Sequence, residues 1–362
     1  GVQKTDSEKG LRGSKEAFSE SVKMNTALIR KRIRNAKMKA EEKQVGRYSA
    51  TTTALLYLDG VVYLPICEEM RKRLDAFEVD GGMIEYLTRK KKEGRFPVYQ
   101  TTERPDRAAQ AILEGRVVLL TDNSPEALIF PATLNSLFQT ADDYYRNERI
   151  VTFLRLIRYV AAFLALALPG LYVAAATFHP QLLPGNLIRS MAEARSGVPF
   201  PTAAEVLLME LSFELLREAG LRMPGPAGNT IGIVGGLIVG QAAVSANLVS
   251  PITVTVAALT ALGSFSIPNE ELSEVFRLWK YGILLLGSCF GILGVMLGCF
   301  LLLMLMAEQE SYGIPWLYPY VGGNLNEGAD EKDSMFLAAA RKRKRRPIFA
   351  KWGNRIRFRR KS

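Results

Sequence analysis

Residues 159–178 read YVAAFLALALPGLYVAAATF, an uncharged run long enough to decide what kind of protein this is. A helix needs about 20 mostly apolar residues to cross about 30 Å of hydrocarbon, so the run predicts a membrane span. It separates two unlike parts of the chain. Residues 1–150 are rich in charge, whereas residues 159–306 hold most of the long uncharged runs. We therefore expect a soluble N-terminal region followed by a helical membrane region at 151–307.

Three further apolar stretches follow the first one along the chain. They read TIGIVGGLIVGQAAVSANLV (230–249), PITVTVAALTALGSFSI (251–267) and YGILLLGSCFGILGVMLGCFLLLMLM (281–306). Four spans are therefore predicted. Arg155 and Arg158 precede the first span, and basic runs at 341–346 and 355–362 follow the last. Because basic residues mark the cytoplasmic side and an even number of spans returns the chain to it, we expect a multi-pass protein with both termini cytoplasmic.

Between the first two spans lies EVLLMELSFELLREAG (205–220), which carries four glutamates and one arginine. On a helix, Glu210, Glu214, Arg217 and Glu218 share one side and leucines occupy the others, and Arg217 offsets part of the charge of Glu214. Such a helix suits the membrane surface better than a fifth span, so we predict an interfacial amphipathic helix at 203–219. In a symmetric oligomer its carboxylates either attract cations to a pore mouth or simply face water.

The soluble region divides into two predicted parts. Residues 1–46 are basic and predict a helical segment, whereas residues 47–150 alternate between strand-like and helical patterns. The strand-like stretches are ATTTALLYLDG (50–60), PVYQT (97–101) and RVVLLTDNSPEALIF (116–130), and the helical ones are CEEMRKRLDAF (67–77), GGMIEYLTRKKKEG (81–94) and PDRAAQAILEG (105–115). We therefore predict a cytoplasmic α/β domain, for which we expect no export signal.

The residue patterns of common enzyme and metal sites are missing from the sequence. Its one histidine, His179, follows the first span, and no glycine-rich phosphate loop follows a strand. Cys67, Cys289 and Cys299 show neither zinc nor disulfide spacing. We expect no enzymatic activity, no cofactor and no metal.

Residues 308–362 form a basic tail directly after the last expected span. Its aromatic residues, Phe349, Trp352 and Phe358, are too few to indicate nucleic-acid binding. Attraction to anionic lipid is the simpler interpretation. We expect a cytoplasmic tail whose partner is membrane lipid, with no nucleic acid bound.

Glycines and uncharged polar residues mark further positions in the spans. Small residues repeated every four positions let helices approach closely, either within one chain or between subunits. Polar groups in hydrocarbon need partners, which are neighbouring helices, water in a pore or carbonyls of the same helix. The packing candidates are Gly232, Gly236, Gly240, Gly287 and Gly291, and the pore or interface candidates are Gln241, Ser245, Thr260 and Ser264.

The sequence TERPDR (102–107) is the most distinctive phrase of the soluble region. Pro105 and Asp106 are favourable at the start of a helix. Arg104 and Arg107 are expected to bond the adjacent DNSP turn at 122–125. A structural role for the signature, which comprises Glu103, Arg104, Pro105, Asp106 and Arg107, is favoured over ligand binding.

Five phrases of the chain closely resemble the GerA family, the A subunits of bacterial spore germinant receptors and their spore-membrane paralogues. They are LRGSKEAFSESVKMNTALIRKRI (11–33), TTERPDRAAQAILEGRVVLLTDNSP (101–125), DDYYRNERIVTFLRLIRY (142–159), VPFPTAAEVLLMELSFELLREAGLRMP (198–224) and IVGGLIVGQAAVSANLVSP (233–251). Family members carry a further N-terminal subdomain before the first phrase, most of which is not in this chain.

The resemblance implies a protein of the spore inner membrane that works with B and C subunits. It also implies an oligomer that forms a nutrient-gated cation channel and triggers germination. A non-conducting membrane scaffold and a transport subunit of the same complex are the alternatives. The fold expected is a soluble α/β N-terminal domain followed by an α-helical polytopic membrane domain with about four spans and an interfacial amphipathic helix.

Overall fold

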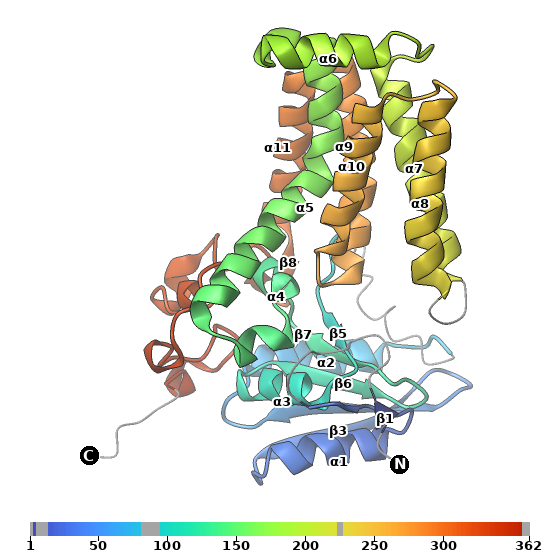
Figure 1. Ribbon diagram of the computed structural model, residues 1–362. Coiled ribbons are helices and arrows are strands. Elements are labelled where there is room, and N and C mark those ends of the chain that lie inside the picture. Colours follow the sequence, from blue (N-terminus) through green and yellow to red (C-terminus); the bar gives the residue numbers. More distant parts are fainter. Residues whose placement is uncertain (1–2, 5–13, 81–94, 223–226, 357–362) are drawn as a thin grey trace. The chain divides into compact units, whose positions relative to one another are not determined.

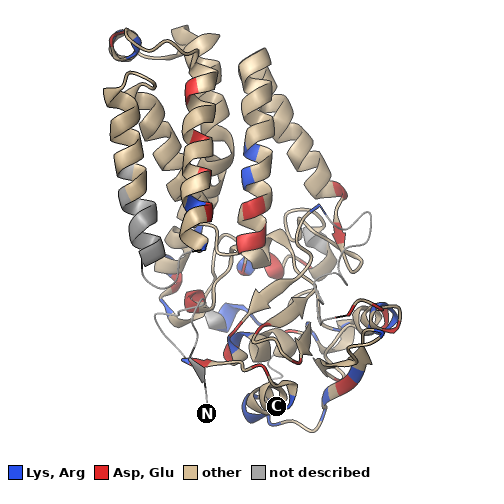
Figure 2. Cartoon of the chain, turned by 90° about the vertical axis from the view of Figure 1, so that its right-hand side faces the viewer, with Lys and Arg blue, Asp and Glu red and all other residues tan. Residues whose placement is uncertain are grey.

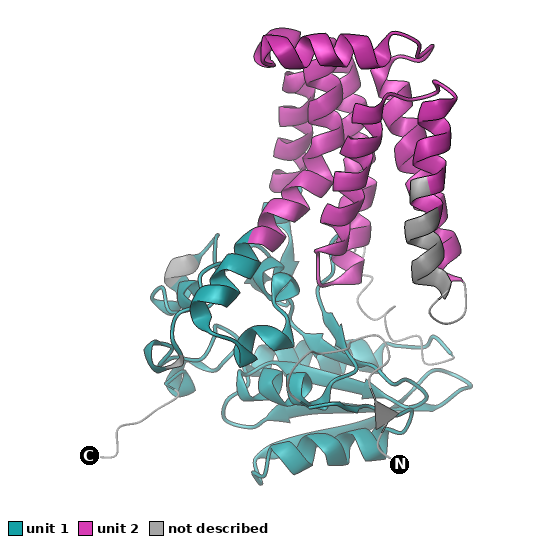
Figure 3. Cartoon of the chain, viewed as in Figure 1, with its two compact units in different colours: residues 1–156, 305–362 teal, residues 157–304 magenta. Residues whose placement is uncertain are grey.

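The computed structural model describes residues 3–4, 14–80, 95–222 and 227–356. The chain divides into two units, which Figure 3 colours separately. Unit 1 comprises residues 1–156 and 305–362, and unit 2 comprises residues 157–304. A sheet-containing N-terminal region followed by helices confirms the expected fold class at this level.

A five-stranded antiparallel sheet forms the centre of unit 1, in the order β3-β4-β6-β7-β5 (Figure 1). The strands are β3 (Met38–Val45), β4 (Thr51–Leu58), β5 (Gln100–Thr102), β6 (Val117–Thr121) and β7 (Ala127–Phe130). Every residue of β6 and β7 is buried. A separate pair joins β1 (Gln3–Lys4) to β2 (Glu16–Ala17).

Helices cover both faces of this sheet. On β4, Leu56 faces the side where α1 (Val22–Arg32) and α3 (Pro105–Leu113) pack, and Leu55 faces the side of α2 (Leu64–Asp75). This alternation is the two-residue period of a strand that is buried on both faces. The structure has the strands and helices predicted in residues 47–150, with two exceptions: the strand expected at 97–101 forms at Gln100–Thr102, and the helix expected at 81–94 lies outside the described residues.

The expected helical segment at 1–46 is wrong near its end, because residues 38–45 form strand β3. Only Met38 and Val45, at the two ends of β3, are fully buried. The residues between these two ends, KAEEKQ (39–44), are mostly charged. Charged side chains are typical of an edge strand, which borders solvent. Pairing with β4 therefore decides this element, and among the described residues of this segment the helix is Val22–Arg32.

The tail is a folded part of unit 1. Trp316 is fully buried, and its indole Nε1 donates a hydrogen bond to the Pro97 carbonyl at 2.8 Å. Tyr318 and Phe349 join the core on the α2 side of the sheet. Its short elements are β8 (Glu310–Ser311), β9 (Ile314–Pro315) and the 3₁₀ turns η4 (Gly323–Asn326), η5 (Asp330–Lys332), η6 (Ala340–Lys342) and η7 (Trp352–Asn354).

Part of the basic run at 341–346 is used inside the fold. Arg343 lies 2.9 Å from Asp333, and Arg345 lies 2.7 Å from Glu327. The Arg346 guanidinium donates to the Leu113 carbonyl. The sequence could not show this, because the acceptors come from other segments of the chain.

Helices make up unit 2 (Figure 1). Two short elements of unit 1, α4 (Leu134–Phe138) and η2 (Ala141–Tyr145), precede the first long helix, α5. The remaining elements are α5 (Glu148–Thr177), η3 (Pro180–Leu182), α6 (Gly185–Arg195), α7 (Thr202–Leu221), α8 (Ala227–Ser245), α9 (Pro251–Phe265), α10 (Glu270–Phe290) and α11 (Ile292–Glu308). Successive helices from α7 to α11 alternate in direction, and α6 lies across one end of the unit.

One helix of the described residues, α5, is long and apolar enough to cross a membrane by length and composition. It contains all but the last residue of the run at 159–178, from which the first span was predicted. Two others, α9 and α11, are apolar but shorter. The four predicted spans are therefore not established.

The fourth predicted span is wrong as a single helix. The stretch 281–306 is divided between α10 and α11 at Gly291, which has φ +63° and ψ −142°. Beyond the break the two helices fold back, since a Cβ on Gly298 would lie 2.9 Å from Ile283 and one on Gly287 would lie 2.9 Å from Val295. The sequence did not indicate this turn, because the residues on both sides of Gly291 are apolar.

Candidate functional site

Two ion pairs join α7 to α10 inside unit 2. The Lys280 ammonium lies 2.5 Å from a carboxylate oxygen of Glu210, and both side chains are at most 5% exposed. One helical turn away, Arg277 pairs with Glu214. We call these four residues the α7–α10 ladder. Figure 2 shows such charges interrupting otherwise uncharged helices.

The ladder explains why an apolar stretch carries glutamates. A buried carboxylate or ammonium alone costs several kcal/mol, and a close partner offsets much of that cost. Helix α7 also packs within the unit: Met209 shares an apolar cluster with Ala257 of α9, and Val206 shares one with Val173 of α5. These contacts do not place the helix relative to a membrane, so the interfacial helix at 203–219 stays a prediction.

The other charges predicted on this helix have partners too. Glu214 forms its close ion pair with Arg277 of α10, and Arg217 contributes a longer-range electrostatic interaction with Glu214. The Arg217 guanidinium lies over the Phe265 ring at 5.2 Å. Glu218 pairs with Arg222 at 2.7 Å, and both side chains are largely exposed.

Glu205, which falls off the ionic stripe, has the most enclosed position on α7. It is fully buried and accepts hydrogen bonds from the Ser250 amide at 2.9 Å and the Thr253 hydroxyl at 3.1 Å. Arg195 pairs with its other oxygen at 3.2 Å. Glu205 therefore ties α6, α7 and the start of α9 together.

The uncharged polar candidates separate into two pairs. Thr260 and Ser264 of α9 are buried, and their hydroxyls donate to carbonyls of their own helix at 2.9 and 2.7 Å. Gln241 and Ser245 of α8 are exposed. A role for either pair in a pore stays a prediction.

The glycine candidates with described surroundings contact helices of the same chain. A Cβ on Gly236 would lie 3.0 Å from Phe213 of α7, and one on Gly240 would lie 3.1 Å from Val254 of α9. Gly287 similarly approaches the Gly170 carbonyl of α5. Gly232 lies in α8, but its surroundings are outside what the structure describes. The contacts favour packing within the chain, and an oligomer interface stays a prediction.

The TERPDR signature is held by contacts within unit 1. Arg104, with a side chain 2% exposed, pairs with Asp106 at 2.8 Å and approaches Asp142 at 3.7 Å. Arg107 donates to the Gln139 carbonyl. The expected bonds between these arginines and the DNSP turn stay a prediction. Thr102 pairs with Ala127, so the signature begins at the end of the sheet where this turn lies. Pro105 begins α3, and the Glu103 carbonyl accepts from the Phe18 amide.

The contacts of Asp106 favour its charged form. Burial opposes ionisation, but the hydrogen bonds and charge of Arg104 outweigh it and lower the pKa of the Asp106 carboxyl. Tyr145 adds a hydrogen bond at 3.2 Å. These contacts support the structural role predicted for the signature.

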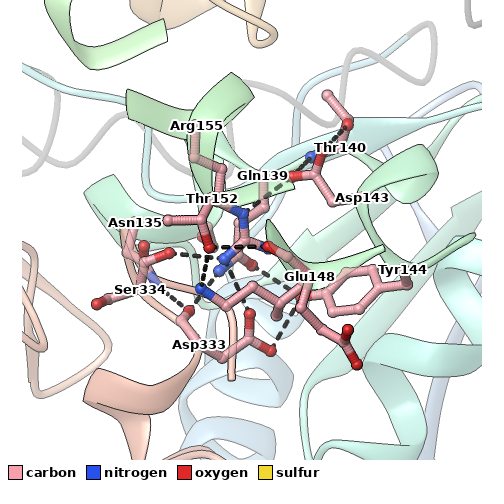
Figure 4. A network of polar contacts seen from close by, with 12 residues as sticks. Asn135, Gln139, Thr140, Asp143, Tyr144, Glu148, Thr152, Arg155, Asp333 and Ser334 are labelled. Carbon is pink, nitrogen blue, oxygen red and sulfur yellow. Dashed lines mark hydrogen bonds and ion pairs between the residues drawn. The ribbon is translucent and has the colours of Figure 1, made fainter. Parts of the chain in front are cut away.

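A second polar network surrounds Arg155 at the start of α5 (Figure 4). The guanidinium is 1% exposed and donates to Asp143 at 3.1 Å, to Asp333 at 3.0 Å and to the Ser334 carbonyl at 2.6 Å. Tyr144 donates to Asp333 at 3.3 Å. We call these five residues the Arg155 cluster. It joins the segment before α5, the first turns of α5 and the returning tail.

Sequence reasoning missed the partners that complete both networks. Arg277 and Lys280 stand in EELSEVFRLWKY, just before the expected fourth span, and their spacing of three matches one turn of a facing helix. Asp333 stands in the tail, where nothing nearby in the sequence points to Arg155. A search for opposite charges at matching helical spacing could have found the first set but not the second.

Known proteins resemble this chain over most of its length. A family model described as "Bacillus/Clostridium GerA spore germination protein" matches residues 1–349. The "Uncharacterized membrane protein YfkQ" of Bacillus subtilis is 39% identical over 93% of this chain and 66% of its own length. "Spore germination protein KA" of the same species is 36% identical over 88% and 59%, and "Spore germination protein A1" is 38% identical over 86% and 66%. The chain thus spans about three fifths to two thirds of these relatives.

A solved structure also matches in part. It is the N-terminal domain of the A subunit of the Bacillus megaterium spore germinant receptor GerK3. It is 34% identical, covers 33% of this chain and 97% of its own, and has a TM-score of 0.28. The family model matching nearly the whole chain, rather than this structure, decides the assignment: the chain belongs to the GerA family of spore germination proteins.

Proposed function

We propose that this chain is a subunit of a spore germinant receptor, the A subunit or a close paralogue, which works with B and C subunits in the spore inner membrane. It crosses the membrane several times and oligomerises into a nutrient-gated cation channel. Family membership and the names of the relatives support the germination role.

The observation that carries the conduction part is the α7–α10 ladder. Ionisable side chains are expensive within a membrane, and they commonly mark ion or substrate pathways. Here Glu210 and Lys280 are enclosed by helices whose remaining side chains are mostly apolar. Glu218 and Arg222 lie near the C-terminal end of the same helix, where their exposure suits a pore mouth.

The test is cation flux from liposomes that contain the full chain with its B and C subunits. Potassium efflux on addition of nutrient supports a channel. A scaffold gives none, and a transporter moves potassium only when a second solute moves with it. Liposomes prepared without this chain give the baseline potassium efflux.

Two exposed residues sharpen this test. If this end of α7 borders the pore, the Glu218 charge concentrates cations there, so E218Q should lower the cation conductance. The Arg222 charge repels cations, so R222Q should raise the conductance. Both effects grow as salt falls, because the Debye length lengthens from about 10 Å at 0.1 M to about 30 Å at 0.01 M. Equal conductance of both variants at low salt contradicts this placement.

A further inference from the structure

Arg116 is a buried arginine of unit 1. Among the residues that the structure describes, no carboxylate forms an ion pair with it. It stands just before β6 and is 6% exposed. One of its terminal nitrogens donates to the Gln100 side-chain oxygen at 3.0 Å, and its Nε has no hydrogen-bond partner. Its guanidinium lies over the Phe349 ring at 4.2 Å.

This arrangement differs from that of the other buried arginines described above. Arg104 and Arg155 each pair with two carboxylates. A cation removed from water without an ionic partner costs several kcal/mol, and burial accordingly lowers the pKa of Arg116. The aromatic ring and one neutral oxygen compensate only part of this cost.

Arg116 lines a polar pocket beside α3 and η2. Its volume of about 40 Å³ holds about three water molecules or one small ion. Arg107 is a second cation in the wall, and Glu114 supplies one carboxylate, which accepts from Gln110 at 3.3 Å. The two arginines therefore leave an excess of positive charge.

We infer that this pocket binds a small oxyanion of carboxylate type, held by the guanidinium of Arg116. The planar fork of an arginine matches the two oxygens of a carboxylate, and a charge-assisted pair would supply the partner that Nε lacks.

The position of the pocket links it to the Arg155 cluster. Gln139 and Tyr144 line the pocket, and both also donate to Asp333, at 2.7 and 3.3 Å. Asp333 in turn pairs with Arg155 at the start of α5. An ion in the pocket would thus contact the residues that position the tail against α5.

The test titrates the purified full chain in detergent with sodium acetate, with sodium chloride adjusted to constant ionic strength. Wild-type protein should show a saturable rise in unfolding temperature and broadening of the ¹³C-acetate resonance. R116Q should bind at least tenfold more weakly, whereas R30Q, at an exposed position of α1, should bind as the wild type does. Circular dichroism confirms that each variant is folded.

A second variant keeps the result interpretable if R116Q fails to fold. Ala141 lines the pocket and is only half-buried, so A141L fills the space without removing a charge. It should abolish acetate binding in a folded protein. Acetate effects that persist in A141L, or that chloride reproduces in the wild type, overturn the inference. Phosphate titrated in parallel shows whether a tetrahedral oxyanion is accepted instead.

Discussion

Glu210 and Lys280 show how single residues can stabilise or destabilise a helical unit. Each side chain is buried, and the Lys280 ammonium donates a charge-assisted hydrogen bond to the Glu210 carboxylate. The pair is tolerated because each charge offsets the desolvation of the other. Removing one partner is therefore expected to cost more than removing both.

The first prediction concerns this asymmetry. Glu210→Met should lower the free energy of unfolding by about 3–5 kcal/mol, because it leaves Lys280 buried without a partner. The double variant with Lys280→Met should recover most of that loss. Thermal unfolding in mild detergent measures both, and E218Q, at an exposed pair, should change stability by less than about 0.5 kcal/mol. A double variant no more stable than the single one contradicts the argument.

Asp106 gives a prediction about pH. Its pKa is lower in the folded protein than in the unfolded chain, so its stabilising contribution is present above about pH 4 and is lost as pH falls through the folded value. D106N should therefore cost about 2 kcal/mol at pH 7 and markedly less at pH 3. Denaturant unfolding at the two pH values decides this, and an equal cost at both would rule out the ion pair as its origin.

At the scale of elements, one glycine separates α10 from α11. The backbone of Gly291 lies in a region that other residues rarely adopt, and a Cβ there would lie 2.9 Å from His179 and 3.1 Å from Phe178. The turn thus depends on a residue without a side chain. It folds α11 back along α10 within one continuous apolar stretch.

Substitution of this glycine is the prediction at that scale. G291A should destabilise unit 2 by about 1–3 kcal/mol, because alanine is strained in this conformation. Gly282 lies inside α10 with open space around its Cα, so G282A should be neutral or stabilise by up to about 1 kcal/mol. Thermal unfolding of the pair in the same detergent compares them, and equal effects would show that the backbone conformation is not limiting.

At the scale of the whole molecule, the tail completes unit 1. Asp333 pairs with Arg155 at 3.0 Å and with Arg343 at 2.9 Å, although about 180 residues separate Asp333 from Arg155 in the sequence. Trp316 and Phe349 add apolar contacts. The unit is therefore built from both ends of the chain.

The prediction for this unit is that D333N costs about 3 kcal/mol of its stability, because Arg155 then keeps only one carboxylate partner. D59N, at an exposed position after β4, should change stability by less than about 0.5 kcal/mol. Limited proteolysis provides the readout: the tail should be cut faster in D333N alone. Identical cleavage of both variants would mean that the cluster does not hold the tail.

Topology supplies the last prediction. Helices α5 and α7 to α11 alternate in direction, so the chain enters and leaves unit 2 at the same end (Figure 1). In a cysteine-free background, Lys37→Cys and Lys351→Cys should both resist an impermeant thiol reagent applied outside intact cells. Ser190→Cys of α6 should react. Labelling of only one of the first two positions contradicts a return of the chain to its starting side.

The sequence by itself determined the elements whose pattern is local. The uncharged run at 159–178 predicts α5, and the apolar strand and helix patterns predict β4, α3, β6 and β7. In these elements the apolar residues of one short segment repeat with the period of a helix or a strand, so the element can be predicted without knowledge of distant contacts. Family membership was likewise evident from phrases of the sequence.

Only the tertiary structure decided which distant groups meet. Glu210 and Lys280 are 70 positions apart, β3 exists because β4 pairs with it, and the basic tail folds because its acceptors lie in other segments. Glu214 likewise pairs with Arg277, which is 63 positions away on another helix. The sequence shows which side chains are charged and therefore require an opposite charge or a hydrogen-bond partner when they are buried. Packing between distant segments determines which residue is that partner.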